Sequence, residues 1–308
     1  MSKFIRRALL ALVVLFLLAF ISLRGRESPS AWGQNDFRAY WGASYLLVQG
    51  ERFNEHDTLF NLQQSIMGSE LNAALMTWNP PWILTLFIPL TLFSFYDAAL
   101  FWMFVNAFLF VWSLEAIWHM WPEDQRVPGR KLWLYAATLL FFPFWNSIAI
   151  GQIVPMLLFG FVGAIFFAEK RPFIAGMCLV LLTAKPHLVL ITLPILLIDT
   201  LFRKNWRFLL GFGTTLIVLT GIGLLLRPAL FIDYLTDTGS TTVIGQLPAV
   251  FLPFLFAILI GWLPLRFIGV ALVPISLYVW FKHWKDTMSQ DRFFHLALVS
   301  QLASLIVA

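Results

Sequence analysis

The sequence predicts an all-α protein: a polytopic transmembrane bundle of about nine to eleven helices, with an extracytoplasmic loop that carries short interfacial helices. Composition is the first observation behind this, because 60% of the 308 residues are apolar and 12% are charged, about half the charged fraction of a soluble domain. The second is that apolar runs recur along nearly the whole chain. The third is that many basic residues stand in short loops between these runs. A soluble globular enzyme and a disordered chain are therefore excluded.

Charge and cysteine content argue against a nucleic-acid-binding protein and against a disulfide-stabilised one. The net charge is +5, but the basic residues near Lys3, Arg126, Lys170 and Arg203 form separate groups, as cytoplasmic loops between spans do. Membrane topology thus explains the charge without nucleic acid. The single cysteine, Cys178, lies in an apolar run, and one cysteine permits no intrachain disulfide.

The apolar runs define the expected spans, and we treat residues 1–308 as a single integral-membrane domain. Residues 8–23 follow a basic start and predict an uncleaved first span with a cytoplasmic N-terminus, and residues 24–77 form the first extracytoplasmic loop. The later apolar segments are residues 82–95, 98–120, 132–148, 154–168, 173–184, 188–201, 208–226, 249–263, 267–281 and 293–308. The last run ends without a polar flank, which predicts a truncated C-terminus.

Several of these segments are too short for a simple crossing. They reach roughly 18 to 24 Å as helices, less than the roughly 30 Å of hydrocarbon. We therefore expect some to be broken or re-entrant, which requires that the irregular backbone is buried in protein or lines a wet cavity. The positions of the basic loops make residues 82–95 our choice for the segment that does not cross.

The extracytoplasmic loop predicts two short amphipathic helices. Residues 35–50 carry aromatic side chains at helical spacing between an Asn-Asp start and a Gly stop, which suits a helix at the membrane interface. Residues 58–67 carry a second apolar face at helical spacing. The sequence Trp78-Asn79-Pro80-Pro81 then breaks the chain, because paired prolines can begin a helix but not continue one.

Five motifs occur in order along this background: Asp36-Phe37-x-x-Tyr40, Gly50-x-x-Phe53, Trp78-x-Pro80-Pro81, Gly151-Gln152 and Ala175-Gly176…Ala184-Lys185-Pro186. Together, over residues 33–199, they resemble glycosyltransferase family 87. These are polytopic enzymes of the GT-C class, which include polyprenyl-phosphate-mannose-dependent mannosyltransferases. Family members are usually longer, and a polar-aromatic motif that tends to follow the last segment is absent here.

The resemblance implies a hexosyltransferase with a lipid-phosphate sugar donor. A hexose, with mannose favoured, would pass from a polyprenyl-phosphate carrier to an acceptor hydroxyl of a glycolipid or glycan on the outer face of the membrane, with inversion. The oxocarbenium-like transition state needs a carboxylate to accept the hydroxyl proton. Asp36 matches the family's position for that general base. It also suits an N-cap, and the two roles are compatible.

Cations must offset the charge that develops on the departing phosphate. We expect Lys185, Arg38 and His187 to bind it, because Lys185 stands between apolar runs where an uncompensated charge is costly. The alternatives are that Lys185 snorkels to the interface, that Arg38 is solvated or ion-paired, and that His187 caps the next helix. Arg52 is a weaker candidate of the same kind.

Four polar or aromatic residues are expected to line the cavity: Tyr40, Trp78, Asn79 and Gln152. A plain polar turn between two spans is an equally good account of Gln152. On the expected topology, the turns near Gly151 and Lys185 face the same side as the long loop. The histidines lack metal-ligand spacing, so we expect no metal site and no cofactor, and metal dependence stays open.

Two other function classes stay open: a multispan transporter or channel, and a non-catalytic scaffold or decayed relative. The sequence lacks matching inverted halves, which favours the transferase over the transporter. The glycine pairs at residues 211–213 and 221–223 indicate close helix packing. Asp233 and Asp237 are expected to be solvated residues of an outer loop. We expect the protein in the plasma (inner) membrane.

Overall fold

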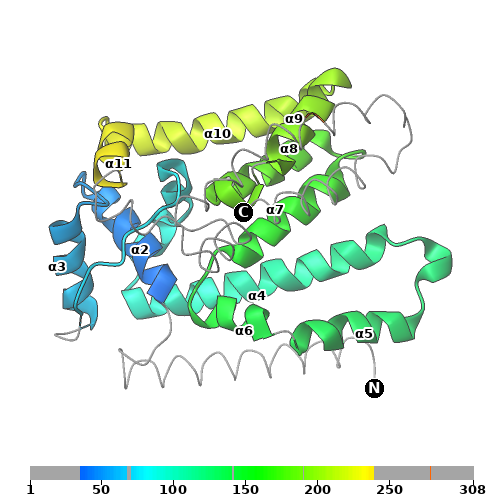
Figure 1. Ribbon diagram of the computed structural model, residues 1–308, viewed down its shortest axis with the longest axis horizontal. Coiled ribbons are helices and arrows are strands. Elements are labelled where there is room, and N and C mark those ends of the chain that lie inside the picture. Colours follow the sequence, from blue (N-terminus) through cyan, green and yellow to red (C-terminus); the bar gives the residue numbers. More distant parts are fainter. Residues whose placement is uncertain (1–34, 68–70, 141, 190, 239–277, 279–308) are drawn as a thin grey trace, which may run out of the picture. The chain divides into compact units, whose positions relative to one another are not determined.

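The computed structural model describes residues 35–67, 71–140, 142–189, 191–238 and 278 (Figure 1). The regular elements in these ranges are all helices, as the sequence predicts. The expected spans at residues 8–23, 249–263, 267–281 and 293–308 lie outside these continuous ranges. The chain divides into two compact units, Met1–Phe159 with Leu219–Asp237, and Gly160–Val218 with Thr238–Ala308.

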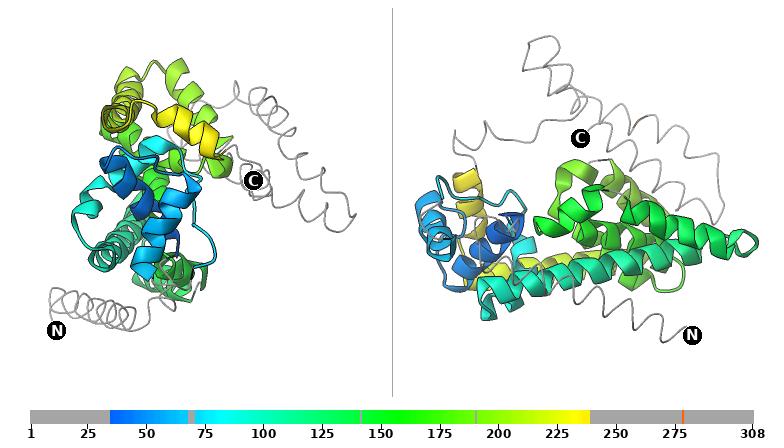
Figure 2. Two further views of the ribbon diagram at one scale, coloured as in Figure 1. Left: turned by 90° about the vertical axis from the view of Figure 1, so that its left-hand side faces the viewer. Right: turned by 90° about the horizontal axis from the view of Figure 1, so that it is seen from below.

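The first unit contains the predicted loop helices and the first long span. Its elements are α2 (Asn35–Val48), α3 (His56–Met67), the 3₁₀ helices η2 (Pro81–Leu86) and η3 (Ile88–Leu92), α4 (Phe95–Met120), η4 (Glu123–Gln125), α5 (Pro128–Leu139), α6 (Phe142–Ala149), the start of α7 (Val154–Phe167), the end of α10 (Trp206–Leu226) and most of α11 (Leu230–Thr238). Helices α2, α3 and α11 lie together (Figures 1 and 2). Helices α2 and α3 occupy the two stretches of the first loop that we expected to be helical.

The aromatic face of α2 differs from expectation. Instead of lying in a membrane interface, it is buried within the first unit, with Phe37 fully buried and Tyr40 and Trp41 each 5% exposed. The ring of Phe37 lies between Phe95 and Trp102, with ring centroids 5.9 and 6.2 Å away. Amphipathic spacing reveals which face of a helix is apolar, but not whether lipid or protein covers it, and here protein does.

Residues 82–95, which we expected not to cross, form the short 3₁₀ helices η2 and η3 rather than one α-helix. Such backbone leaves carbonyl groups without helical partners, and α2 supplies donors for two of them. The Trp41 indole Nε1 donates to the Leu90 carbonyl at 3.2 Å, and the Ser44 hydroxyl donates to the Leu84 carbonyl at 2.9 Å. Most of η2 is thus buried in protein and both helices are hydrogen-bonded to α2, whereas the end of the segment at Leu92 and Phe93 is exposed.

Helix α4 is the longest element in the described residues. Ser94 caps its start by accepting a hydrogen bond from the Asp97 N–H, and its 26 residues reach about 39 Å at 1.5 Å per residue. The apolar segment at residues 132–148 is different, because it is two helices, α5 and α6, rather than one. Pro143 stands in the first turn of α6, where proline starts a helix but cannot continue one from α5.

The second unit holds the rest of α7, α8 (Pro172–Val180), η5 (Leu181–Ala184), η6 (Pro186–Val189), α9 (Thr192–Phe202) and the first part of α10. Helices α8 and α10 pack through glycines. A Cβ atom on Gly176 would lie 2.0 Å from the Phe208 carbonyl oxygen, and one on Gly211 would lie 2.0 Å from the Phe173 carbonyl oxygen. The close packing predicted for residues 211–213 is therefore confirmed at Gly211, but Gly213 has no atom within 4 Å of the same position.

Two described helices are long and apolar enough to cross a bilayer, namely α4 and α10. The remaining apolar helices of the described part are shorter: α7, the combined run of α8 and η5, and α9. This matches the expectation that several apolar segments are too short for a straight crossing.

Candidate active site

Asp36 lies in the first turn of α2, beside the turn that carries the Gly-Gln motif. Its backbone N–H donates a hydrogen bond to the Ile150 carbonyl at 2.9 Å, and its side chain is half-buried. Ile150 immediately precedes Gly151 and Gln152. Two motifs that are more than 100 residues apart in the sequence are therefore neighbours within the first unit. The helix start also favours the ionised carboxylate, because the helix dipole is positive there.

The glycines of two motifs have a backbone reason. Gly50 and Gly151 have φ values of 74° and 72°, in the left-handed region that glycine adopts without strain. Each glycine follows a helix, and the same two backbone hydrogen bonds close both helix ends. After α6, the Gly151 N–H donates to the Ile148 carbonyl and the Gln152 N–H donates to the Ser147 carbonyl, which is a Schellman cap. The Gly-Gln motif thus fixes where α6 stops and where Ile150 points its carbonyl.

Helix α4 holds this turn from the other side. The Trp102 indole Nε1 donates to the Gly151 carbonyl at 2.9 Å, and the Asn106 Nδ2 donates to the Gln152 carbonyl at 3.1 Å. Trp102 and Asn106 are one helical turn apart, so they present their donors on one face of α4. Sequence reasoning missed both residues. The available signal was a polar amide inside an apolar span, which is costly unless its groups are hydrogen-bonded.

Tyr40 and Arg38 are both buried on α2. Burial, together with the negative charge of Asp36 one turn earlier, raises the pKa of the Tyr40 hydroxyl well above its usual value. The Tyr40 ring lies 5.3 Å from that of Phe87. Arg38 is 7% exposed, and its Nε atom has no hydrogen-bond partner among the described residues. Burial lowers the pKa of its guanidinium, so this cation is held in the protein without a matching carboxylate at Nε.

Trp78 and Asn79 belong to a hydrogen-bonded loop of the first unit. The Tyr234 hydroxyl on α11 donates to the Trp78 carbonyl at 2.9 Å. The Thr77 hydroxyl donates to the Asn79 Oδ1 at 3.2 Å, and Asn79 is 6% exposed. Asn54 and Thr77 exchange two further hydrogen bonds of 3.0 Å. The loop motif is therefore fixed to both the α2–α3 connection and α11.

Lys185 and His187 lie in the second unit, at the break predicted from the Ala-Lys-Pro motif. The backbone of Lys185 is not helical, with φ −129° and ψ 78°, because the proline that follows disfavours helical backbone. Partial burial of the imidazole, and then the positive charge of Lys185, lower the pKa of His187. A neutral His187 beside a half-buried Lys185 provides one cation and one neutral donor. That these groups meet Asp36 stays a prediction.

Asp233 and Asp237 correct one expectation. They are not solvated loop residues, because they lie on α11 and are 7% and 8% exposed. Arg227 donates to Asp233 at 2.6 Å and to the Gly50 carbonyl at 2.7 Å, while Arg52 pairs with Asp237. Burial raises the pKa of Asp237 above its usual range, and the guanidinium of Arg52 offsets this only in part.

The partners of these carboxylates explain why the sequence did not reveal them. Arg52 and Asp237 are 185 positions apart, so no local pattern joins them. The one local signal was the spacing of four between Asp233 and Asp237, which puts both carboxylates on the same helical face. Arg52, a weaker candidate for binding the donor phosphate, forms its ion pairs with the carboxylates of α11.

A family model, glycosyltransferase family 87, matches residues 77–308. No curated protein and no solved structure matches the chain. The matched residues include the Gly-Gln turn and the Ala-Lys-Pro break, whereas Asp36 precedes them. Because the match covers more than half of the chain, this protein belongs to glycosyltransferase family 87, whose members are membrane glycosyltransferases.

Proposed function

We propose that this glycosyltransferase is a polytopic enzyme of the plasma membrane that moves a hexose, with mannose favoured, from a polyprenyl-phosphate donor to an acceptor hydroxyl on the outer face. Asp36 is the general base. The acceptor oxygen bonds to the anomeric carbon while the bond from that carbon to the phosphate oxygen breaks, with inversion. Asp36 takes the hydroxyl proton, and the lipid phosphate leaves as an anion.

The observation that carries this proposal is the hydrogen bond from the Asp36 N–H to the Ile150 carbonyl at 2.9 Å. It attaches the start of α2 to a turn that α4 holds through Trp102 and Asn106. A base must be held within a fraction of an ångström of the proton that it removes, and backbone attachment to a rigid span provides this. In this role Trp102 and Asn106 position Asp36 rather than react.

The donor phosphate needs cations near the reacting carbon. Arg38 supplies one in the same helix as Asp36, since its Nε is buried without a partner among the described residues. A guanidinium binds phosphate oxygens through paired N–H groups, which suits this role. Lys185 and His187 add a second cation and a neutral donor from the Ala-Lys-Pro break. Tyr40, Trp78, Asn79 and Gln152 line the sugar-binding cavity in this proposal.

The test is transfer of radiolabelled sugar from polyprenyl-phosphate-mannose, with polyprenyl-phosphate-glucose in parallel, by membranes that contain the chain or its Asp36→Asn form. Loss of a general base costs about 10²- to 10⁴-fold in turnover, so we expect the variant to lose at least about 100-fold. The amide is close in size to the carboxylate, so the variant should still insert and fold. Protease resistance of the membrane-bound protein checks this.

Asp57→Asn is the matched control. Asp57 lies in the first turn of α3 in the same unit, and its side chain is 86% exposed, so its loss removes a comparable charge at a helix start and should leave transfer unchanged. Wild-type turnover by the Asp36→Asn variant would refute Asp36 as the base. Absence of transfer from either donor by inserted wild-type protein would refute the proposed hexose donor.

A further inference from the structure

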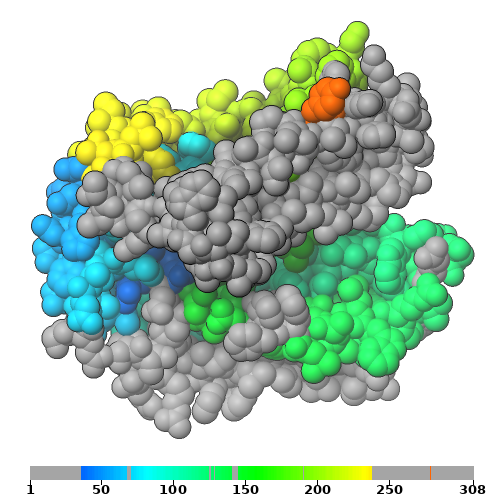
Figure 3. Space-filling view, in the orientation of Figure 1, coloured from blue at the N-terminus to red at the C-terminus, as the bar shows by residue number. Residues whose placement is uncertain are grey.

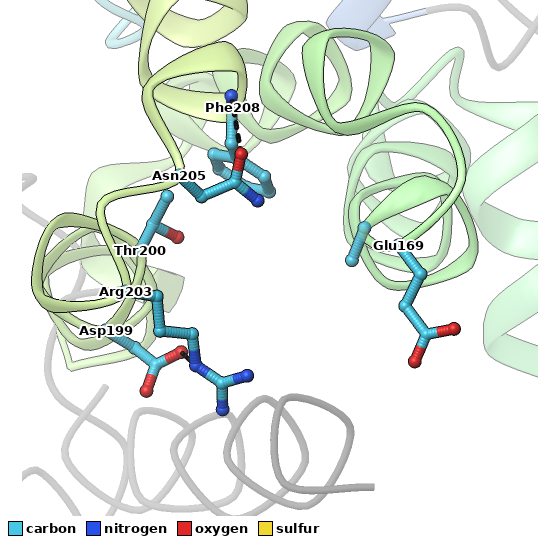
Figure 4. Close-up of a pocket in the computed structure, with 7 residues that line it drawn as sticks. Glu169, Asp199, Thr200, Arg203, Asn205 and Phe208 are labelled. Atoms are coloured by element: carbon cyan, nitrogen blue, oxygen red, sulfur yellow. Dashed lines mark hydrogen bonds and ion pairs between the residues drawn. The ribbon is translucent and has the colours of Figure 1, made fainter. Parts of the chain in front are cut away.

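The second unit contains a cavity that the proposed reaction does not use. It lies where α7 and α9 end and α10 begins, and its volume is about 180 Å³ (Figure 4). One bound water needs only about 10–15 Å³ on this measure, so the space suits a group several times larger. Its lining includes the charged side chains of Glu169, Asp199 and Arg203 and the amide of Asn205.

One wall of the cavity is built by an ion pair on α9. Asp199 is fully buried, and its Oδ2 lies 2.7 Å from Nε of Arg203, one turn later in the helix. The Arg203 side chain is 40% exposed, and its two terminal nitrogens have no partner among the described residues. Figure 4 shows them turned away from Asp199. The buried carboxylate thus fixes the guanidinium and leaves its forked donor edge available.

The backbone that follows is also fixed. The Lys204 N–H donates to the Leu201 carbonyl and the Asn205 N–H to the Thr200 carbonyl, which closes the end of α9. The Asn205 Oδ1 then accepts from the Phe208 N–H at 3.4 Å and caps the start of α10. The wall that carries Arg203 is therefore held from both sides.

The opposite wall carries a carboxylate. Glu169 comes from the end of α7, across the cavity from Arg203 (Figure 4). It is exposed and has no ion pair among the described residues. Four exposed cations are close in sequence to the lining residues: Lys170, Arg171, Lys204 and Arg207. They stand in the two basic loops that the charge pattern assigns to the cytoplasmic side.

We propose that this cavity binds an ammonium–phosphate zwitterion, the headgroup of an ethanolamine phospholipid in the cytoplasmic leaflet. The phosphate oxygens accept hydrogen bonds from the terminal nitrogens of Arg203, and the primary ammonium donates to Glu169. A purely anionic headgroup leaves Glu169 facing negative charge. A choline headgroup has no N–H to donate, so it satisfies Arg203 but not Glu169.

The experiment uses the purified full chain in detergent and measures lipid binding by native mass spectrometry. The probes are phosphatidylethanolamine, phosphatidylcholine and phosphatidylglycerol with identical acyl chains. We expect phosphatidylethanolamine to bind about tenfold more tightly than either of the others, a difference of about 1.4 kcal/mol. Equal affinity for all three lipids would overturn the proposal.

Variants separate the two contacts. Glu169→Gln should remove the preference for ethanolamine over choline, and this exposed position carries little folding risk. Arg203→Lys keeps a cation beside Asp199 but loses the fork, so it should weaken phosphatidylethanolamine binding several-fold. Glu123→Gln is the matched control, because Glu123 is an exposed acid in another basic loop, and it should change nothing. An unchanged preference in Glu169→Gln would overturn the assignment of Glu169.

A soluble competitor distinguishes the headgroup from the acyl chains. Glycerophosphoethanolamine carries the same zwitterion without chains, and at millimolar concentration it should displace the lipid, whereas glycerophosphocholine should not. Failure of glycerophosphoethanolamine to compete would mean that the chains alone provide binding, which contradicts the proposal. None of these measurements depends on sugar transfer.

Discussion

Lys204 has a backbone conformation that its side chain does not favour. Its φ of 54° makes it the one residue other than glycine with a positive φ in the described part of the chain. It occupies the helix-ending position that Gly50 and Gly151 occupy elsewhere, with the same pair of hydrogen bonds. An L-residue pays about 1–2 kcal/mol in this region, and the cap recovers part of that cost.

Lys204→Gly should therefore stabilise the protein. The relief of the left-handed strain exceeds the entropy that glycine adds to the unfolded chain, so we expect a gain of about 0.5–1 kcal/mol in the free energy of unfolding. Thermal unfolding in detergent measures it. Lys170→Gly serves for comparison, since Lys170 has no positive φ, and it should not gain. A loss of stability in Lys204→Gly would show that the strain is not present.

At the scale of elements, the packing of α8 on α10 depends on single glycines. Gly211→Ala would place a Cβ 2.0 Å from the carbonyl oxygen of Phe173, which is backbone and cannot rotate away. We expect it to cost about 1–3 kcal/mol. Gly213→Ala is the control in the same helix, because its Cβ would meet nothing within 4 Å, and alanine favours helix by about 0.5–1 kcal/mol. Thermal unfolding of both variants measures the contrast, and equal midpoints would contradict the close contact.

Some of these helices were predictable from the sequence and others were not. The long span α4 and the helix α2 were predictable, because a sustained apolar run and a helix with clear start and stop signals act locally. The division of residues 132–148 could also be read locally, since Pro143 supplies the break, but uniform hydropathy hid it. The glycine pair at residues 211–213 indicated close packing, yet only the packed structure separates Gly211 from Gly213.

The candidate site was predictable only residue by residue. Asp36 and the Gly-Gln turn were each chosen from motifs, but their contact requires the fold. Asn106 stood out only as a polar amide inside an apolar span, because the sequence does not identify its partner, a backbone carbonyl far along the chain. Asp237 was taken as solvated because its cation, Arg52, lies on a distant loop. Local sequence therefore reveals candidate residues and helix ends, whereas hydrogen bonds and ion pairs between residues far apart in the chain depend on packing.

At the scale of the whole molecule, we expect α11 and the first loop to lie on one side of the membrane, because they are joined within the first unit. The ion pair of Arg52 with Asp237 and the hydrogen bond from Arg227 to the Gly50 carbonyl join them within the first unit. In Figure 3 the yellow surface of α11 adjoins the blue surface, which belongs to the first described residues from residue 35 onward. The carboxylates are buried but the Arg52 side chain is 43% exposed, so solvent screens the pair, and removing one partner costs less than the about 3–5 kcal/mol of a fully buried pair.

This shared side fits the charge pattern. Residues 24–77 carry a net negative charge, whereas the loops near Arg126, Lys170 and Arg203 are basic. The positive charge predicts that these three basic loops are cytoplasmic. The first loop, and α11 with it, is then expected on the outer side. The contacts within the first unit and the charge composition of the loops support this topology independently of each other.

Cysteine labelling tests this topology, because the chain has one cysteine, Cys178, which is buried. In a Cys178→Ala background, Asp57→Cys places a thiol on an exposed part of α3, and Lys170→Cys places one in a basic loop. A membrane-impermeant maleimide should label Asp57→Cys in intact cells and label Lys170→Cys only after permeabilisation. The Cys178→Ala parent should stay unlabelled throughout. Labelling of Lys170→Cys in intact cells would place that loop outside and reverse the topology on which both the proposed donor site and the lipid site depend.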